Sequence, residues 1–480
     1  MTNTEDCMSI NNKLQLSPEA MRELGHRVID QLTEHFRQLP DKRVTQIGAR
    51  AELEASLREP LPESGTAAET VLEQLQRDVW TQISHTNHPR FFAFIPAPGN
   101  FISVLAETLT AGYNPFAGTW VGASGAAQVE LVTIDWLRQL CGLPETAGGH
   151  FVSGGSMANL TALAVARHIR LQDRTENAVV YYSDQTHSCV DRALWLLGFR
   201  PEQIRRLESD DEYRLDPARL RDAVTQDRAA GRRPFCVVAN AGTTNTGAID
   251  PLEALADYCA QENLWLHIDG AYGAAAVLCE RGRKLLAGLE RADSLALDPH
   301  KWLFQPYETG VVLLRDGSLL RRSFHVLPEY MHDTNRALEE VNFCEQGVQL
   351  TRSFRALKVW LSFKVFGVAS FRAAVERGFE LAALAERTLR ENGCWQVTSP
   401  ATLAMVSFRY VWPGASEAEL NDFNQRLAAA GIADGFAFAS STVLRGRFAL
   451  RLCPINPRTT DEDIRASLAR LERLASELSR

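Results

Sequence analysis

The feature that most constrains the fold is an alternation of short apolar runs and helical stretches between residues 90 and 375. Helical stretches such as residues 251–261 separate runs that have the length of buried strands. Parallel strands need such crossovers, because each connection must return to the edge where the previous strand began. The sequence therefore predicts an α/β fold with a mostly parallel sheet. The strand-like runs are residues 178–182, 235–239, 264–268, 294–297 and 311–314.

The segments on either side of this region have different patterns. Residues 1–89 are mainly helical: Ser17 can cap a helix over residues 17–39, Pro18 suits its first turn, and a second helical stretch covers residues 66–84. We therefore expect an N-terminal helical segment (1–89), a large α/β domain (90–375) and a small C-terminal α+β domain (376–480). In the last of these, helical runs at 376–392, 416–430 and 461–478 flank strand-like pieces at 402–410 and 447–453.

Composition and charge exclude several classes of protein. The 480 residues contain 51 Lys and Arg against 59 Asp and Glu, so there is no basic excess to neutralise nucleic-acid phosphates. No stretch approaches the ~18 consecutive apolar residues of a membrane span, and the polar N-terminus lacks the layout of an export signal. The nine cysteines form no Cys-x-x-Cys pair and predict reduced thiols. We expect a cytoplasmic protein with neither a nucleic-acid nor a membrane partner.

The first candidate site is a glycine-rich turn in residues 151–159, which read Phe-Val-Ser-Gly-Gly-Ser-Met-Ala-Asn and precede an apolar helix over residues 160–169. Free backbone N–H groups at such a helix start can bind a phosphate. The turn matches neither the Walker P-loop nor the G-x-G-x-x-G dinucleotide motif. A helix cap with a tight turn explains it equally well.

Two further candidates follow buried strands. His187 lies just beyond the strand at residues 178–182, and taken alone it is more simply a hydrogen-bonded loop histidine. Asp269 ends the strand at residues 264–268, where an unpaired buried charge would be costly. It can cap the next segment or act as the counter-ion of a protonated ring nitrogen.

The fourth candidate is Lys301, which follows the strand at residues 294–297 and precedes Trp302. A lysine in this position either extends its amine to solvent or is a nucleophile with a depressed pKa. The four loops together fit a ligand with a phosphate, a flat ring, a basic ring nitrogen and an aldehyde. Pyridoxal 5'-phosphate has all four groups.

Three motifs make the chain resemble the group II pyridoxal-phosphate-dependent amino-acid decarboxylases: Ser183-Asp-Gln-Thr-His187, His267-Ile-Asp-Gly-Ala271 and Asp298-Pro-His-Lys-Trp302. Their order and spacing match from about residue 75 to residue 360. The segments at residues 88–96 and 135–137 are most similar to the aromatic-amino-acid and tyrosine branch. The resemblance implies fold type I (aspartate aminotransferase-like), a pyridoxal phosphate cofactor and a small-molecule L-amino acid substrate. It also implies a homodimer with its active site at the subunit boundary, and N-terminal helices wrapped over the partner.

The resemblance assigns roles around the cofactor ring. Lys301 would form the Schiff base, and Asp269 would keep the pyridine nitrogen protonated. His187 would stack on one face of the ring, and Ala271 would pack against the other.

It also assigns residues to the phosphate end of the cofactor. Gly155 and Ser156 would hold the phosphate, with His300 near phosphate and substrate and Thr244 beside the cofactor. Asp298 is a less secure contact, because an ionised carboxylate repels a phosphate. Its side chain either turns away or accepts a hydrogen bond from a neighbouring hydroxyl.

The proton that completes an amine product needs a donor. In the family a tyrosine on a mobile loop supplies it, and Tyr330, within residues 324–332, occupies the matching position. His187 and Tyr330 both keep the residue type of decarboxylases, which favours plain decarboxylation over an oxygen-using aldehyde synthase of the same family.

The substrate remains open between several classes. Side chains that could line an apolar pocket, or equally belong to the core, favour an aromatic amino acid: Phe92, Phe94, Pro96 and Phe116. Thr351 could narrow such a pocket. Arg352 and Arg355 could instead serve an acidic substrate, or form structural ion pairs, so glutamate, cysteine-sulfinate and diaminobutyrate decarboxylation remain alternatives.

Readings outside decarboxylation are also available. An aminotransferase or lyase would share the lysine, the aspartate and the phosphate loop. A non-enzymatic scaffold would be expected to have lost Lys301 or Asp269, and both are present. His85 and His88 raise the possibility of a zinc hydrolase, although no helical spacing or third ligand supports it.

Overall fold

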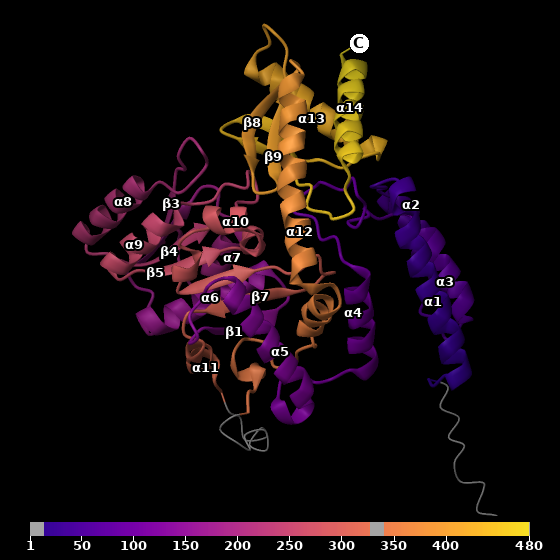
Figure 1. The fold of residues 1–480 in the computed structure, drawn as a ribbon, viewed down its shortest axis with the longest axis horizontal. Helices are drawn as coiled ribbons and strands as arrows, with labels where there is room; N and C mark the ends of the chain where they lie inside the picture. The colour runs from indigo at the N-terminus through magenta and orange to yellow at the C-terminus, as the bar shows by residue number, and fades with distance from the viewer. Residues whose placement is uncertain (1–13, 327–339, 480) are drawn as a thin grey trace, which may run out of the picture.

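A seven-stranded sheet lies at the centre of the computed structural model, which describes residues 14–326 and 340–479 (Figure 1). The strand order is β1-β7-β6-β5-β4-β2-β3, and β7 alone runs antiparallel to its neighbours. The predicted mostly parallel sheet is confirmed, and β1 and β3 are not among the five apolar runs named as strands. The strands are β1 (Gly148–Val152), β2 (Ala178–Ser183), β3 (Ile204–Leu207), β4 (Arg233–Asn240), β5 (Trp265–Asp269), β6 (Ser294–Leu297) and β7 (Gly310–Leu314).

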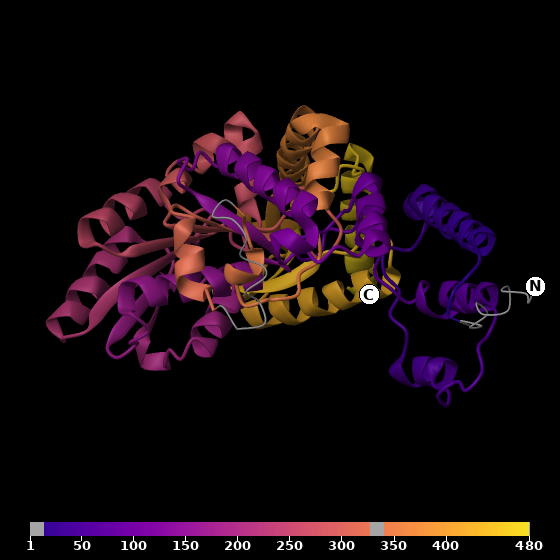
Figure 2. The ribbon, with the colours of Figure 1, turned by 90° about the horizontal axis from the view of Figure 1, so that it is seen from below.

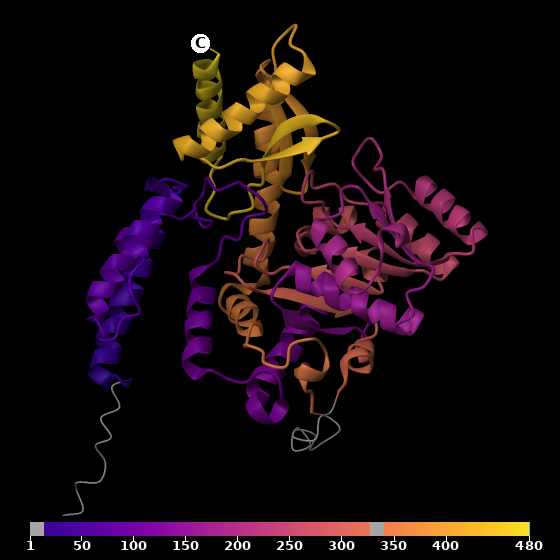
Figure 3. The same cartoon turned by 180° about the vertical axis from the view of Figure 1, so that it is seen from behind.

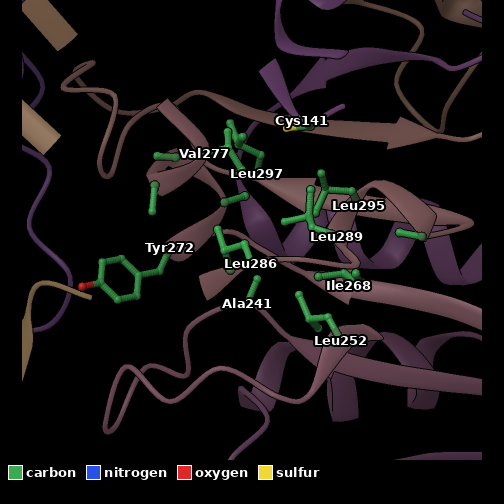
Figure 4. Packing of buried hydrophobic residues seen from close by; sticks show 14 of the residues in the cluster. Cys141, Ala241, Leu252, Ile268, Tyr272, Val277, Leu286, Leu289, Leu295 and Leu297 are labelled. Carbon is green, nitrogen blue, oxygen red and sulfur yellow. The ribbon is translucent and has the colours of Figure 1, made fainter. Parts of the chain in front are cut away.

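Helices cover both faces of this sheet. One face packs against α6 (Gly155–Leu171), α7 (Ser188–Leu196) and α11 (Ser318–Phe324). The other packs against α5 (Trp120–Leu140), α8 (Pro217–Ala229), α9 (Leu252–Glu262) and the first half of α12 (Ala356–Glu391). Figure 4 shows part of this second layer, where Leu252 of α9 lies near Ile268 of β5. The short α10 (Glu280–Leu285) follows a buried 3-10 turn at Gly273–Leu278.

Strand β5 separates polar from apolar side chains by simple alternation. Leu266 and Ile268 belong to the apolar layer on the α9 side. His267 is hydrogen-bonded to Asn159 of α6 on the opposite side, and Asp269 is bonded to the same asparagine. Successive side chains of a strand point to opposite faces, so this one strand delivers two polar groups to α6.

A smaller antiparallel sheet forms the C-terminal part, in the order β10-β11-β9-β8. It packs with α13 (Glu417–Asp434), α14 (Asp461–Leu478) and the second half of α12. Helix α12 thus runs from the large sheet to the small one, and it is interrupted at Gly367, whose φ of 72° suits a residue without a Cβ. The strands are β8 (Trp395–Thr402), β9 (Met405–Tyr410), β10 (Ser440–Leu444) and β11 (Arg447–Leu452).

The N-terminal helices stand beside the two sheets. They are α1 (Pro18–Gln38), α2 (Arg50–Leu57) and α3 (Ala68–Gln74), the last extended by a π turn to Val79. Ser17 caps α1 as expected, accepting from the Ala20 amide at 3.2 Å. None of the residues of α1, α2 and α3 is buried. Figures 2 and 3 show them at one end of the molecule, and α4 (Phe101–Tyr113) lies between them and the large sheet.

A buried histidine connects this segment to the body. His88 is completely buried; its Nε2 donates to the Lys42 carbonyl at 3.1 Å, and its Nδ1 accepts from the Arg90 amide at 2.9 Å. Only the neutral ring can make both bonds, because Nδ1 must be unprotonated to accept. Burial, followed by the charge of Arg90, lowers the pKa of His88 from 6.5 to about 4.

This arrangement predicts a loss of stability in acid. Between pH 6.5 and pH 4 the unfolded chain binds a proton at His88 that the native chain excludes. The contribution of the neutral His88 ring to the free energy of unfolding is therefore complete above pH 6.5 and is lost as the pH falls to 4. The linked free energy is about 3 kcal/mol. In urea unfolding across this pH range, the stability advantage of the wild type over His88→Gln should shrink by that amount. A constant difference would contradict the assignment.

Candidate active site

A cavity of about 430 Å³ opens where β2, β4, β5 and β6 end and α6 begins. Ligands bind at this edge of parallel sheets because the loops that follow the strands converge there. Nine of the ten residues predicted for the site line this cavity, and the tenth, Tyr330, lies outside the described residues. The nine are Gly155, Ser156, His187, Thr244, Asp269, Ala271, Asp298, His300 and Lys301.

An ion pair lies at the floor of the cavity. The Lys301 amine is 2.9 Å from Asp298 Oδ2, and the Asp298 side chain is almost completely buried. Burial lowers the pKa of Lys301, but the carboxylates of Asp298 and Asp269 more than offset it, so the pKa is raised. Of the two alternatives for this lysine, a depressed pKa does not hold in this arrangement, because two acids face the amine.

The ion pair with Lys301 fixes the orientation of the Asp298 side chain. The sequence left open whether this side chain turns away from the cofactor or accepts a hydrogen bond from a hydroxyl. In the structure it accepts from the ammonium group of Lys301 instead. Its Oδ1 is buried without a hydrogen-bond partner. The nearest backbone is glycine: a Cβ on Gly310 would lie 2.8 Å from Asp298 Oδ1, and one on Gly155 would lie 2.8 Å from Oδ2. The glycines therefore make room for this carboxylate.

Asp269 lies at the end of β5 with both of its oxygens engaged. Oδ1 accepts from the Ala271 amide at 3.1 Å, and Oδ2 accepts from the Asn159 amide group at 3.2 Å. Each carboxylate oxygen can accept more than one hydrogen bond. The acid is thus held in one orientation and can still accept from a further donor in the cavity.

Two histidines flank the lysine, and burial lowers the pKa of each. His187 Nδ1 caps α7 by accepting from the Cys189 amide at 3.2 Å. Desolvation lowers the pKa of His187, although the field of Asp269 opposes it. His300 Nδ1 donates to the Thr309 carbonyl at 2.7 Å, and burial lowers the pKa of this ring against the opposing field of Asp298.

The start of α6 has the character of an anion site. Its N-cap, Gly154, offers no side-chain hydrogen bond to the first turn, and Gly155 and Ser156 begin the helix at the cavity wall. Uncapped N–H groups and the helix dipole favour a negative group at such a position. A Cβ on Gly155 would also come within 3.0 Å of the Ala271 methyl group, so the glycine keeps this approach open.

Sequence reasoning missed several residues of the cavity. Asn159, Asn240 and Tyr307 line it. Asn240 donates to Thr186 Oγ1 at 3.0 Å and so supports the loop that carries His187. Tyr307 is 58% exposed, and its ring lies 5.1 Å from that of His300. Asn240 ends β4, which is the signal that could have found it, whereas Asn159 lies within α6, where no such signal marks it. Tyr307 follows no strand or motif.

The apolar side chains expected to line a substrate pocket do not line this cavity. Phe92 is completely buried in the core of the small domain, so for this residue the core alternative is the right one. Phe94 is 59% exposed and has a left-handed backbone with φ of 56°, an uncommon conformation for a residue with a side chain. Its ring packs edge-on against Phe438.

The two arginines considered for an acidic substrate are both in ion pairs. Arg352 lies 2.6 Å from Glu130, with both side chains buried, and also donates to the Phe151 carbonyl. Arg355 pairs with Glu308 at 2.7 Å, at the edge of the cavity. The ion-pair alternative therefore holds for both.

The zinc alternative finds no ligand set in the described ranges. Both ring nitrogens of His88 are already bonded to backbone groups. No group of three His, Cys, Asp or Glu side chains comes together in residues 14–326 and 340–479. Over the same residues, no helix has both the length and the hydropathy of a membrane span.

Comparison with known proteins identifies the family. A family model described as the pyridoxal-dependent decarboxylase conserved domain matches residues 51–411. The chain belongs to this family. It is 48% identical to an aromatic-L-amino-acid decarboxylase of Bacillus atrophaeus over 98% of both chains, and 30% identical to tyrosine decarboxylase 2 of Narcissus pseudonarcissus over 94% of this chain and 93% of that one. The structure of Oryza sativa TDC with PLP and tryptamine superposes with a TM-score of 0.91 at 28% identity, over 97% and 99% of the two chains.

This decarboxylase has the fold of its solved relatives, fold type I, and acts on amino acids with pyridoxal phosphate as cofactor. The residues of the cavity fit that cofactor. A primary amine can bind its aldehyde, an uncapped helix start suits its phosphate, and a buried carboxylate with remaining acceptor capacity suits a protonated ring nitrogen.

The glycine at the helix start should control access of the cofactor. In Gly155→Ala the new methyl group would lie 2.8 Å from Asp298 Oδ2 and 3.0 Å from the Ala271 methyl group. Overpacking of this kind costs about 1–3 kcal/mol, so cofactor affinity measured by fluorescence titration should fall about tenfold or more.

Gly125→Ala is the matched control, because nothing lies within 4 Å of a Cβ at that helical glycine. It should bind cofactor like the wild type. Equal affinities for Gly155→Ala and Gly125→Ala would show that the space above Gly155 is not used by the cofactor.

Proposed function

We propose that this enzyme converts an aromatic L-amino acid to the corresponding amine and CO₂, with its cofactor carried on Lys301. The convergence of Lys301, Asp269 and the uncapped start of α6 on one cavity carries the proposal. The choice of an aromatic substrate is supported by the 48% identity to the Bacillus atrophaeus enzyme over nearly the whole chain.

Each end of the cavity supplies one requirement of this chemistry. Bound pyridoxal phosphate provides the electron sink that accepts the electron pair left by the departing carboxylate. Asp269, at the end of β5, stabilises a proton on the ring nitrogen and so keeps that sink effective. The amine of Lys301 provides the point of attachment, and Asp298 holds this amine at 2.9 Å from its carboxylate.

The remaining cavity residues bind and orient. His187 and Ala271, which line the cavity, would cover the two faces of the ring. Gly155, Ser156, Thr244 and His300 would hold the phosphate and the reacting end of the substrate. Which bond breaks is a matter of orientation in such a site, because only a bond perpendicular to the ring overlaps with it. Tyr330 remains the proposed proton donor to the product carbon.

Two alternatives fit the cavity less well. An acidic substrate would need a cation besides Lys301 in the cavity, and Arg352 and Arg355 pair with glutamates and do not line it. An aldehyde synthase would yield an aldehyde, ammonia and hydrogen peroxide beside CO₂, and we favour the amine because His187 and Tyr330 keep the residue types of decarboxylases.

Replacement of the lysine tests the proposal directly. Lys301→Ala should lose the visible absorption band that borohydride removes, and CO₂ release from aromatic amino acids should fall at least about a thousandfold. Lys364→Ala, at an exposed lysine of α12, should keep both properties.

The products should be measured with tyrosine, tryptophan, phenylalanine, glutamate and 2,4-diaminobutyrate. Amine and CO₂ from the aromatic substrates alone are expected. Faster turnover of glutamate or diaminobutyrate would overturn the aromatic assignment, and peroxide formed in step with CO₂ would identify an aldehyde synthase.

We further propose that the protein is a homodimer in which the N-terminal segment, residues 1–89, wraps over the partner and the active sites lie at the boundary. Exposed apolar side chains support this: on α1, Met21 and Val28 are 50% and 37% exposed and seven residues apart, hence on one face. Tyr113 at the end of α4 and Trp80 are also exposed. Two more aromatic side chains are exposed: Tyr307, which lines the cavity, and Phe94.

Charged residues in place of the exposed apolar residues Met21 and Val28 of α1 should therefore dissociate the dimer. Burial of each apolar side chain contributes about 1.5–3 kcal/mol, so Met21→Asp with Val28→Asp should raise the dimer Kd about a hundredfold or more in sedimentation velocity. Val443→Asp, at an exposed residue of β10, is the control and should remain dimeric. An unchanged mass for the α1 double variant would exclude this helix from the interface.

A further inference from the structure

A chain of buried hydrogen bonds leads from the sheet to Asp269. Trp265 Nε1 donates to Ser294 Oγ at 2.8 Å, and Ser294 Oγ lies 2.9 Å from His267 Nδ1. His267 Nε2 lies 2.6 Å from Asn159 Oδ1, and Asn159 Nδ2 donates to Asp269 Oδ2 at 3.2 Å. All five side chains are buried.

The direction of every bond in this chain is fixed by its two ends. Asp269 Oδ2 accepts, so the group of Asn159 that faces it must be the amide NH₂, and Asn159 Oδ1 must face His267. His267 Nε2 therefore carries a hydrogen. Burial lowers the pKa of His267 to about 4, so the ring is neutral and Nδ1 accepts from the Ser294 hydroxyl. The hydroxyl oxygen in turn accepts from Trp265.

Asn159 is fully used at this junction. Its second amide hydrogen is directed to Cys189 Sγ at 3.3 Å, so both hydrogens and the carbonyl oxygen are engaged. A side chain with all of its groups bonded and no exposure has one orientation only. The fold supplies the register, because His267 of β5 and Ser294 of β6 are direct neighbours across the two strands.

We propose that Asn159 is the positioning residue of Asp269. The hydrogen bonds from Trp265 through Ser294 to His267 fix the orientation of the Asn159 side chain. Asn159 in turn fixes the carboxylate of Asp269 so that it faces the ring nitrogen of the cofactor. The inference rests on the proposed role of Asp269. A donor to Oδ2 stabilises the ionised carboxylate and leaves Asp269 an acceptor only. A neutral His267 does not compete with the ring nitrogen for the negative charge.

The test compares two cofactors that differ by one atom. Pyridoxal phosphate and its 1-deaza analogue, in which the ring nitrogen is replaced by CH, should be titrated into the apo forms of the full-length wild type and of variants. Asn159→Ala should weaken pyridoxal phosphate binding about tenfold or more, as expected for a lost hydrogen bond to a charged group, and should weaken the deaza analogue less than about threefold.

Asn424→Ala is the control for a lost buried asparagine. Asn424 is completely buried in the small domain and bonds to the backbone of Tyr410 and Leu420. It should shift the affinities of the two cofactors equally and only slightly. Ser294→Ala, which frees His267 to change tautomer, should also weaken binding of pyridoxal phosphate more than binding of the deaza analogue, but by a smaller factor than Asn159→Ala.

The outcomes separate the two levels of the argument. Equal losses for both cofactors in Asn159→Ala would make Asn159 merely structural, and no loss would remove it from the site; either result overturns the inference. If the wild type itself binds the two cofactors equally, the proposed contact of Asp269 with the ring nitrogen fails, and the inference fails with it. Absence of any borohydride-reducible band in the wild type would instead contradict the proposed function.

Discussion

The burial of charge at the ends of two neighbouring strands is the constraint on which the rest of the structure depends. Asp269 ends β5 and Asp298 directly follows β6, and the parallel pairing of β5 with β6 brings the two carboxylates to one edge. Two buried acids need compensation, which Lys301 and the amides of Asn159 and Ala271 supply. Gly155 and Gly310 fit this arrangement, because a Cβ on either would lie 2.8 Å from an oxygen of Asp298, and one on Gly310 would also lie 2.5 Å from the Gly154 backbone.

Three side chains of the small domain bond to the loop after β4: Arg451 to Thr244, and Ser407 and Thr442 to Asn245. Arg451 of β11 is buried and donates to the Thr244 carbonyl, to the Phe94 carbonyl and to Ser440 Oγ. It thereby joins the loop after β4, the exposed Phe94 loop and the small sheet. Tyr272, just past the end of β5, accepts from the Ala404 amide and adds a further connection. The loop after β4, which carries Thr244, is thus bonded to both sheets, so the position of Thr244 depends on how the two sheets pack together.

Much of this could be predicted from sequence because its signals are local. Buried strands and the loops that follow them are visible as apolar runs with polar ends, and they led to Lys301, Asp269 and His187. The pKa direction of Lys301 could not be predicted, since it depends on the side-chain rotation of Asp298. Phe92 could not be assigned to the core, because its neighbours come from the last hundred residues of the chain. Asn159 was hidden because it occupies a helix, where no loop signal marks it.

The burial of Cys189 also bears on the durability of the enzyme. Cys189 lines the cavity in which we propose that pyridoxal phosphate binds. A thiolate at this position would add to the aldehyde carbon of the cofactor and block it. Burial, followed by the field of Asp269, raises the pKa of Cys189 to about 12, so the sulfur stays protonated and weakly nucleophilic. Asp269, which we propose holds the ring nitrogen of the coenzyme, thus also helps burial to keep a neighbouring thiol protonated.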